Sequence, residues 1–157
     1  MERGADMNHL PQKALSIRQP WAWAILNAGK RIENRPRRFH YRGPICLHAS
    51  KADYRKEIAT YRWTCQDVCA AQWHSPLSGP RRNDPGPKLT DLTPAHYDQL
   101  DLGGIVGTAD IIDCVEESDS PWFFGPYGLV LDNVQSLQFI PVKGALGLFD
   151  WRKRLNS

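Results

Sequence analysis

Residues 16–35 read SIRQPWAWAILNAGKRIENR, and they predict a strand end, a short helix and a second extended segment in direct succession. The run Ala14–Arg18 alternates apolar and polar side chains, as is typical of a half-buried strand. Pro20 suits the first turn of a helix because its missing N–H is not needed there. Gly29 can end that helix in a left-handed conformation, so the helix is predicted from Pro20 to about residue 28.

The two tryptophans of this helix are expected to face different surroundings. Trp21 and Trp23 lie about 200° apart around a helix axis, so they cannot both face the core. One of them is expected to line a cleft. Arg18 and Gln19 lie at the strand-to-helix junction, where free backbone amides at a helix N-terminus attract anions. The alternative is that this junction only locks the turn, with Trp21 as a buried plug.

The whole chain has the composition of a globular domain. It has 157 residues, of which 41% are hydrophobic and 24% charged, so it can bury a sizeable core in one domain. No apolar run approaches the roughly 20 residues that cross a bilayer, and residues 1–13 lack the apolar core of a signal peptide. We therefore expect one cytoplasmic domain over residues 14–157, after a loose tail at residues 1–13.

The sequence beyond residue 35 predicts further strands and a long helix. PICLHA reads as a strand, and a helix of about 20 residues should follow from Ser50, because Ser50 and Asp53 resemble a capping box. Residues 74–94 contain five prolines and two glycines and are predicted to form an exposed, mobile insertion, with a short helix starting at Thr93–Pro94. Four strand-like segments complete the chain: GGIVGTADIIDCV, YGLVLDNV, SLQFI and GALGLFDW.

Charge is distributed unevenly along the chain, although the net charge is only +3. Residues 30–42 carry six lysines and arginines against one acid, whereas residues 110–119 carry five acids and no lysine or arginine. One face is therefore expected to attract polyanions while another repels them. The alternative is a charge run that is merely solvated.

The four cysteines are expected to be reduced and structural. A metal site could combine Cys65 and Cys69 with Cys46 and His48, but the spacing is not that of a common zinc ribbon. We expect no metal and no cofactor.

The motif around Lys30, Glu33 and Arg35 resembles the GxKxxExR signature of the ASCH family, with Ala28 at the position where that family usually has glycine. The resemblance continues through GPICLHASK, GGIVGTADI, SPWFFGPYGLVL and KGALGLFDW, and so covers Ala14–Trp151 apart from the insertion. It implies an α+β fold: a PUA-like β-barrel or a strongly curled, mostly antiparallel sheet, flanked by two or three helices.

The resemblance favours a module that binds RNA, single-stranded nucleic acid or a nucleotide in a basic, aromatic-lined cleft. Glu33 would orient an arginine fork toward phosphate, and aromatic rings would stack bases. The expected binding residues are Arg18, Gln19, Trp21, Lys30, Glu33, Arg35, Trp122 and Tyr127.

Two other functional classes remain open at this point. One is a hydrolase: either a metal-independent ribonuclease or an amidohydrolase acting on a modified nucleoside, with candidates Lys51, His48, Ser120 and Lys30. The amidohydrolases among the relatives carry a threonine nucleophile where this chain has Glu33, so their mechanism cannot be transferred. The other class is a protein-interaction module in transcriptional regulation.

Overall fold

The structure, a computed structural model, describes residues 6–74 and 88–156. Within them a single sheet is built from β1 (Lys13–Ile17), β2 (Ile32–Arg35), β3 (Gly43–Ala49), β4 (Gly104–Val115), β5 (Tyr127–Pro141) and β6 (Leu148–Asp150). The α-helices are α1 (Trp21–Asn27), α2 (Glu57–His74) and α3 (Leu89–Leu92), and 3₁₀ turns lie at Met7–His9, Tyr97–Gln99 and Arg152–Arg154.

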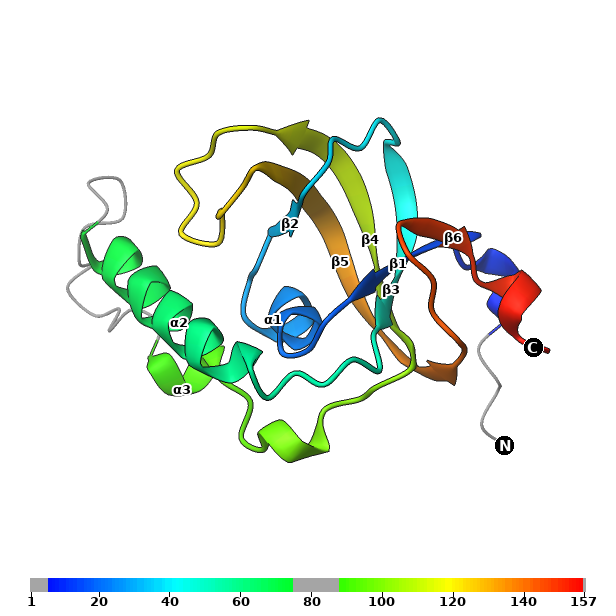
Figure 1. Ribbon diagram of the computed structural model, residues 1–157, viewed down its shortest axis with the longest axis horizontal. Helices are drawn as coiled ribbons and strands as arrows, with labels where there is room; N and C mark the ends of the chain where they lie inside the picture. Colours follow the sequence, from blue (N-terminus) through cyan, green and yellow to red (C-terminus); the bar gives the residue numbers. More distant parts are fainter. Residues whose placement is uncertain (1–5, 75–87, 157) are drawn as a thin grey trace.

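The sheet curls into a half-barrel with the strand order β2-β5-β4-β3-β1-β6. Its β1–β3 pair is parallel and the other pairs are antiparallel. Helix α1 lies in the opening of the curled sheet, and α2 and α3 lie together on one side (Figure 1). The prediction of an α+β fold with a strongly curled, mostly antiparallel, PUA-like sheet is confirmed.

The curl depends on a close approach of β4, β5 and α1 at Gly107. A Cβ atom at this position would lie 2.5 Å from the backbone oxygen of Gln135 and 2.6 Å from the side chain of Leu26. Glycine therefore allows α1 to enter the concave face. Three register shifts between β4 and β5 add to the bending of this pair.

The core consists of three clusters. The largest joins the sheet to α1 and includes Leu15, Ile25 and Leu129. A second lies between α1 and α2, and a third, around Trp151, closes the far edge of the sheet. There Arg152 donates to the carbonyls of Met7 and Leu10, so part of the segment predicted as a loose tail contacts the C-terminal end of the chain.

The first helix is found where it was predicted, and the second begins later. Helix α1 ends before Gly29, whose φ of +68° is the left-handed conformation expected of a helix stop. Helix α2 begins at Glu57, so the predicted capping box at Ser50 is wrong. The reason is local: the Ser50 hydroxyl accepts from the Ala52 N–H and the Asp53 carboxylate from the Arg55 N–H, which closes two turns before the helix.

Two smaller expectations are corrected as well. YGLVLDNV and SLQFI form one continuous strand, β5, in which Asn133 takes a φ of +48°. The helix expected to start at Thr93–Pro94 instead ends at Leu92, which is buried against α2. The predicted mobility of the insertion concerns mainly residues 75–87, which lie outside the described residues. Across the described ranges, no helix has the length and apolar character that a bilayer-spanning segment needs.

Candidate functional site

A pocket of about 260 Å³ lies between α1, β2, α2 and the loop that precedes β5. Its lining, which we call the aromatic pocket, consists of Trp21, Lys30, Glu33, Asn34, Glu57, Thr60 and Phe124. The structure thus brings together Trp21, Lys30 and Glu33, which the sequence analysis named as binding residues.

Lys30 forms the floor of this pocket in a buried ion pair. Only 1% of the Lys30 residue is exposed, and its Nζ lies 2.9 Å from Oε2 of Glu33. The same ammonium donates to the carbonyl of Ile32 and lies 5.7 Å from the ring centre of Trp21. A buried lysine needs such partners, so Lys30 is part of the fold as well as of the pocket.

Arg35 continues this network toward β1 instead of pointing to solvent. Its Nη2 donates to the carbonyl of Ser16 at 2.7 Å and lies 3.4 Å from Oε1 of Glu33. Its Nε is buried with no hydrogen-bond partner among the described residues. The arginine fork was expected to face a phosphate. In the structure the guanidinium of Arg35 instead binds Glu33 and the backbone of β1.

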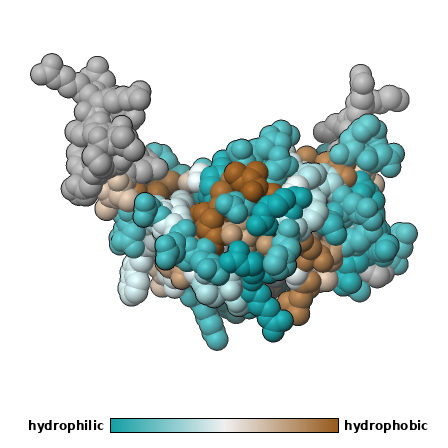
Figure 2. Space-filling model, turned by 90° about the horizontal axis from the view of Figure 1, so that it is seen from above, coloured by the Kyte–Doolittle hydropathy of each residue, from teal (hydrophilic) through white to brown (hydrophobic). Residues whose placement is uncertain are grey.

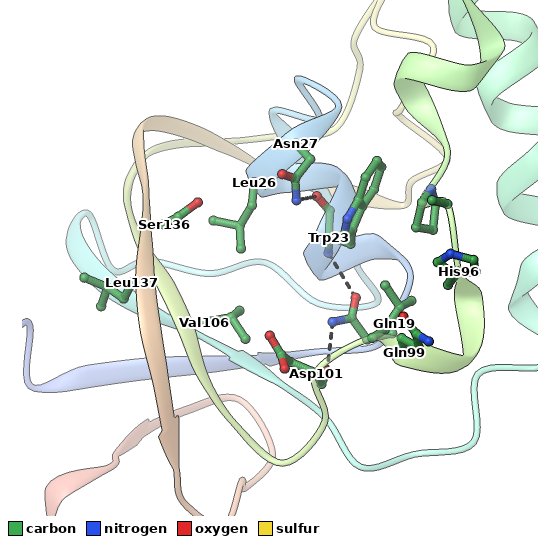
Figure 3. Close-up of a pocket in the computed structure, with 13 residues that line it drawn as sticks. Gln19, Trp23, Leu26, Asn27, His96, Gln99, Asp101, Val106, Ser136 and Leu137 are labelled. Carbon is green, nitrogen blue, oxygen red and sulfur yellow. Dashed lines mark hydrogen bonds between the residues drawn. The ribbon is translucent and has the colours of Figure 1, made fainter.

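Gln19 fixes the start of α1. The residue is 3% exposed; its Oε1 accepts from the Trp23 N–H and its Nε2 donates to the carbonyl of Asp101, each at 3.0 Å (Figure 3). Each end of the amide makes one hydrogen bond, which holds Gln19 in the fold and leaves one N–H of Nε2 over. Arg18 is more than half exposed and pairs with Glu57 at 3.3 Å, at the rim of the aromatic pocket.

Trp23 faces a second pocket, of about 400 Å³, on the concave side of the sheet. Figure 3 shows Trp23 and Leu26 of α1 on one side of it and Val106, Ser136 and Leu137 of the strands on the other. The two tryptophans of α1 therefore line different pockets, although both also pack against the core cluster between α1 and α2, which their spacing did not predict.

The aromatic loop before β5 contributes one exposed ring. Trp122 is 4% exposed and lies against Tyr61, so it supports the pocket wall from behind and cannot stack a base. Phe124 is 57% exposed. The Asn34 side chain holds this loop: its Oδ1 accepts from the N–H groups of Phe124 and Gly125, and its Nδ2 donates to the Trp122 carbonyl.

Phe124 and Asn34 were missed as site residues. A WFF run has no periodicity that tells which ring is exposed, and the hydrogen bonds of Asn34 span about 90 residues of chain. Tyr127 lies apart from the pocket lining, with the Arg38 guanidinium 5.2 Å from its ring centre.

His48 and Lys51 lie in a separate pocket of about 440 Å³, which we call the cationic pocket. Its lining is Ser16, His48, Ser50, Lys51, Ala52, Gly103, Lys143, Gly144, Ala145, Leu146 and Arg154. They therefore lie apart from Lys30, the hydrolase candidate that lines the aromatic pocket. Lys51 is not at a helix N-terminus, because α2 starts six residues later. Ser120 lies outside this pocket, with its hydroxyl accepting from the Trp122 N–H.

The basic and acidic runs do not form two separate faces, contrary to expectation. Arg38 lies 2.6 Å from Glu116, and Arg42 lies 3.6 Å from Asp113, because the loop after β2 passes beside the end of β4. The face seen in Figure 2 is mostly hydrophilic, with apolar residues in separate spots. The basic run is thus partly neutralised by the acidic one.

The four cysteines do not gather at one place, although Cys65 and Cys69 both pack in the cluster between α1 and α2. Cys46 and Cys65 belong to different core clusters, and burial raises the pKa of each thiol to about 11. Among residues 6–74 and 88–156, no three His, Cys, Asp or Glu side chains lie close enough together to hold a metal ion.

The sequence that forms this architecture matches one known protein family. The family model for the ASCH domain matches residues 15–126, well over half of the 157-residue chain. The matched range contains every residue of the aromatic pocket. A search of curated proteins returns no match.

Proposed function

The chain belongs to the ASCH domain family, a PUA-like family, and from this premise we propose that the aromatic pocket binds an unpaired base of RNA or a free nucleotide. One observation carries the proposal: the exposed ring of Phe124 stands at the mouth of a pocket whose floor is the buried Lys30–Glu33 pair. An exposed aromatic face beside fixed hydrogen-bonding groups is the usual way in which proteins hold a single base.

The size of the pocket favours one base over a helix of paired bases. At about 260 Å³ it is slightly smaller than the range typical of drug-sized ligands, roughly 300–1,000 Å³. A base inside a duplex reaches such a pocket only when it leaves the stack. Single strands, loops and mononucleotides are therefore the expected ligands.

The lining offers both donors and acceptors to the edge of a base. Lys30 carries three N–H groups, of which two are accounted for by Ile32 and Glu33, so one remains for a ligand. The Thr60 hydroxyl lies in the same lining and can donate or accept. Arg18, at the rim, supplies a cation near a phosphate.

The test is fluorescence anisotropy with a labelled single-stranded oligoribonucleotide of about eight nucleotides, a length in the range such sites cover. Phe124→Ala should weaken binding by about 1–3 kcal/mol, roughly 5- to 150-fold. The matched control is Trp63→Ala, which removes a 71% exposed ring on α2 that does not line the pocket. Equal losses in the two variants, or no binding at low salt, would contradict the proposal.

The same mixture distinguishes binding from the hydrolase alternatives. A binder leaves the oligonucleotide intact on a gel, and its affinity falls with added salt. Turnover that disappears in Lys51→Ala, or release of acetate from an acetylated nucleoside, would instead favour a hydrolase.

A further inference from the structure

The cationic pocket contains a serine and a histidine arranged as a nucleophile and its base. Ser16 Oγ lies 3.0 Å from His48 Nδ1, and His48 Nε2 lies 2.8 Å from the carbonyl oxygen of Val142. A carbonyl oxygen can only accept, so Nε2 must carry the proton and donate it to Val142. The bare Nδ1 then accepts from the Ser16 hydroxyl.

This polar pair is an exception in its own strand ladder. Ser16 is paired with His48 between β1 and β3, while the neighbouring rungs Ala14–Cys46, Leu15–Leu47 and Ile17–Ala49 are apolar on both sides. Apolar residues therefore suffice to hold these two strands together at the other rungs. His48 is 2% exposed and Ser16 is partly exposed, so the base is shielded while the hydroxyl reaches the pocket.

The surroundings keep the base neutral and pack closely against the pair. Burial lowers the pKa of His48, and the charge of Arg154 adds to that effect, so the imidazole is a free base at pH 7. Gly144 packs directly against the pair: a Cβ atom there would lie 2.6 Å from both Ser16 Oγ and His48 Cε1, so only glycine fits at this position.

The charges of the pocket indicate what kind of molecule it accepts. Lys51, Lys143 and Arg154 line it, and its described lining contains no acid, unlike the basic run near β2. Arg154 also donates to the carbonyl of Lys143, which holds these two residues together. The two lysines of this lining, Lys51 and Lys143, favour a ligand that bears a phosphate or carboxylate group.

We propose that the cationic pocket is a second functional site, in which Ser16 is the nucleophile and His48 its base, acting on a carboxylic ester that carries an anionic group. A nucleophile hydrogen-bonded to a base that a third group orients is the arrangement found in acyl transfer. Here the backbone carbonyl of Val142 takes the orienting role.

Each step of the reaction is balanced. Ser16 Oγ bonds to the carbonyl carbon while its proton passes to His48 Nδ1; the C–O bond to the alcohol then breaks, and the alcohol leaves with that proton. Water attacks the acyl-serine by the same route, giving the carboxylic acid and restoring Ser16 and His48.

The first test is labelling of the full chain with a fluorophosphonate, read by intact mass and by peptide mapping. The serine oxygen bonds to phosphorus and fluoride leaves, so Ser16 should gain the phosphonyl mass. Ser16→Ala should abolish the label, whereas Ser120→Ala, which changes a serine outside the pocket, should keep it. No label on Ser16 in the unaltered protein would overturn the proposal.

The second test addresses the base and the cations. His48→Gln keeps a hydrogen-bonding side chain without a base and should slow labelling at least about 100-fold. The p-nitrophenyl monoester of succinic acid should be hydrolysed faster than p-nitrophenyl acetate, and Lys51→Ala or Lys143→Ala should remove that preference. Unchanged labelling in a folded His48→Gln variant, or equal rates for the two esters, would also overturn it. These outcomes do not depend on Phe124, so they are separate from the RNA-binding test.

Discussion

The buried ion pair beneath the aromatic pocket leads to an asymmetric prediction for stability. Lys30 is 1% exposed, and Glu33 is its carboxylate partner among the described residues, at 2.9 Å. Glu33, in contrast, has a second cation, because Arg35 lies 3.4 Å from its other oxygen. Removing Glu33 therefore strands a buried charge, whereas removing Lys30 leaves the carboxylate with Arg35.

The expected magnitudes follow from this difference. Glu33→Gln should lower the free energy of unfolding by about 3–5 kcal/mol, as when one partner of a buried pair is lost. For a domain of this length that corresponds to a fall in Tm of roughly 6–20 °C. Lys30→Met keeps an unbranched chain of similar length and should cost less, about 1–3 kcal/mol. The double variant should be more stable than Glu33→Gln alone, because no unpaired charge remains.

The assay is urea unfolding followed by tryptophan fluorescence, with the slope of the transition checked for constancy among the variants. Glu116→Gln is the control, since it breaks the pair with Arg38 in which both side chains are well exposed, and it should change stability far less. A loss below about 1 kcal/mol in Glu33→Gln, or a larger loss in Lys30→Met than in Glu33→Gln, would refute the reasoning.

Three further predictions concern backbone, thiols and surface charge. Gly29→Ala should lower the free energy of unfolding in urea by about 1–2 kcal/mol, because φ is +68° although a Cβ would meet no atom within 4 Å. Gly107→Ala should lower it more, because its Cβ would lie 2.5 Å from a backbone oxygen. The reverse order of the two losses would contradict this. Burial raises the pKa of Cys46 and Cys65 to about 11. In the folded protein both thiols should therefore react slowly with Ellman's reagent at pH 8, and faster as the pH rises toward 11. Prompt reaction of both thiols at pH 8 in the folded protein would contradict this prediction. Glu116→Gln removes the acid that pairs with Arg38, so RNA should bind more tightly. The slope of log affinity against log salt concentration should steepen by up to about 0.7 for one added phosphate contact. An unchanged slope would show that Arg38 contacts no phosphate.

Local signals predicted the elements that depend on local chemistry. Pro20 and Gly29 marked both ends of α1, because proline and glycine act through their own backbone conformations. The predicted start of α2 was wrong, because the side chains of Ser50 and Asp53 accept hydrogen bonds within turns that precede the helix. A capping signature indicates that a side chain will satisfy a nearby N–H, but not which of two competing turns it will close.

The site depended more on contacts between distant segments. Lys30 and Glu33 lie close in sequence, so their motif revealed them. The pairing of Arg38 with Glu116 joins residues 78 positions apart, and the antiparallel pairing of β3 with β4 brings the loop before β3 beside the end of β4. Ser16 was not predicted to be reactive, because a serine in an alternating strand normally faces solvent, and its relation to His48 follows from the β1–β3 register.

The source of the positive character at the aromatic pocket is therefore not the one that composition suggested. The exposed arginines after β2 are offset by acids of the β4 end, so they contribute little net field. Within the pocket lining, Lys30 faces Glu33 and Glu57. Arg35, which binds Glu33, and Arg18 at the rim bring the total to one positive charge in excess, and of these cations Lys30 and Arg35 are largely buried. A buried charge is screened less by salt than an exposed one, so it acts on a ligand in the pocket even at physiological ionic strength. Selection for a base with an electron-rich edge would then come from the buried network of Lys30, Glu33 and Arg35. The exposed basic run would set only the rate at which the protein and RNA associate and the salt dependence of that rate.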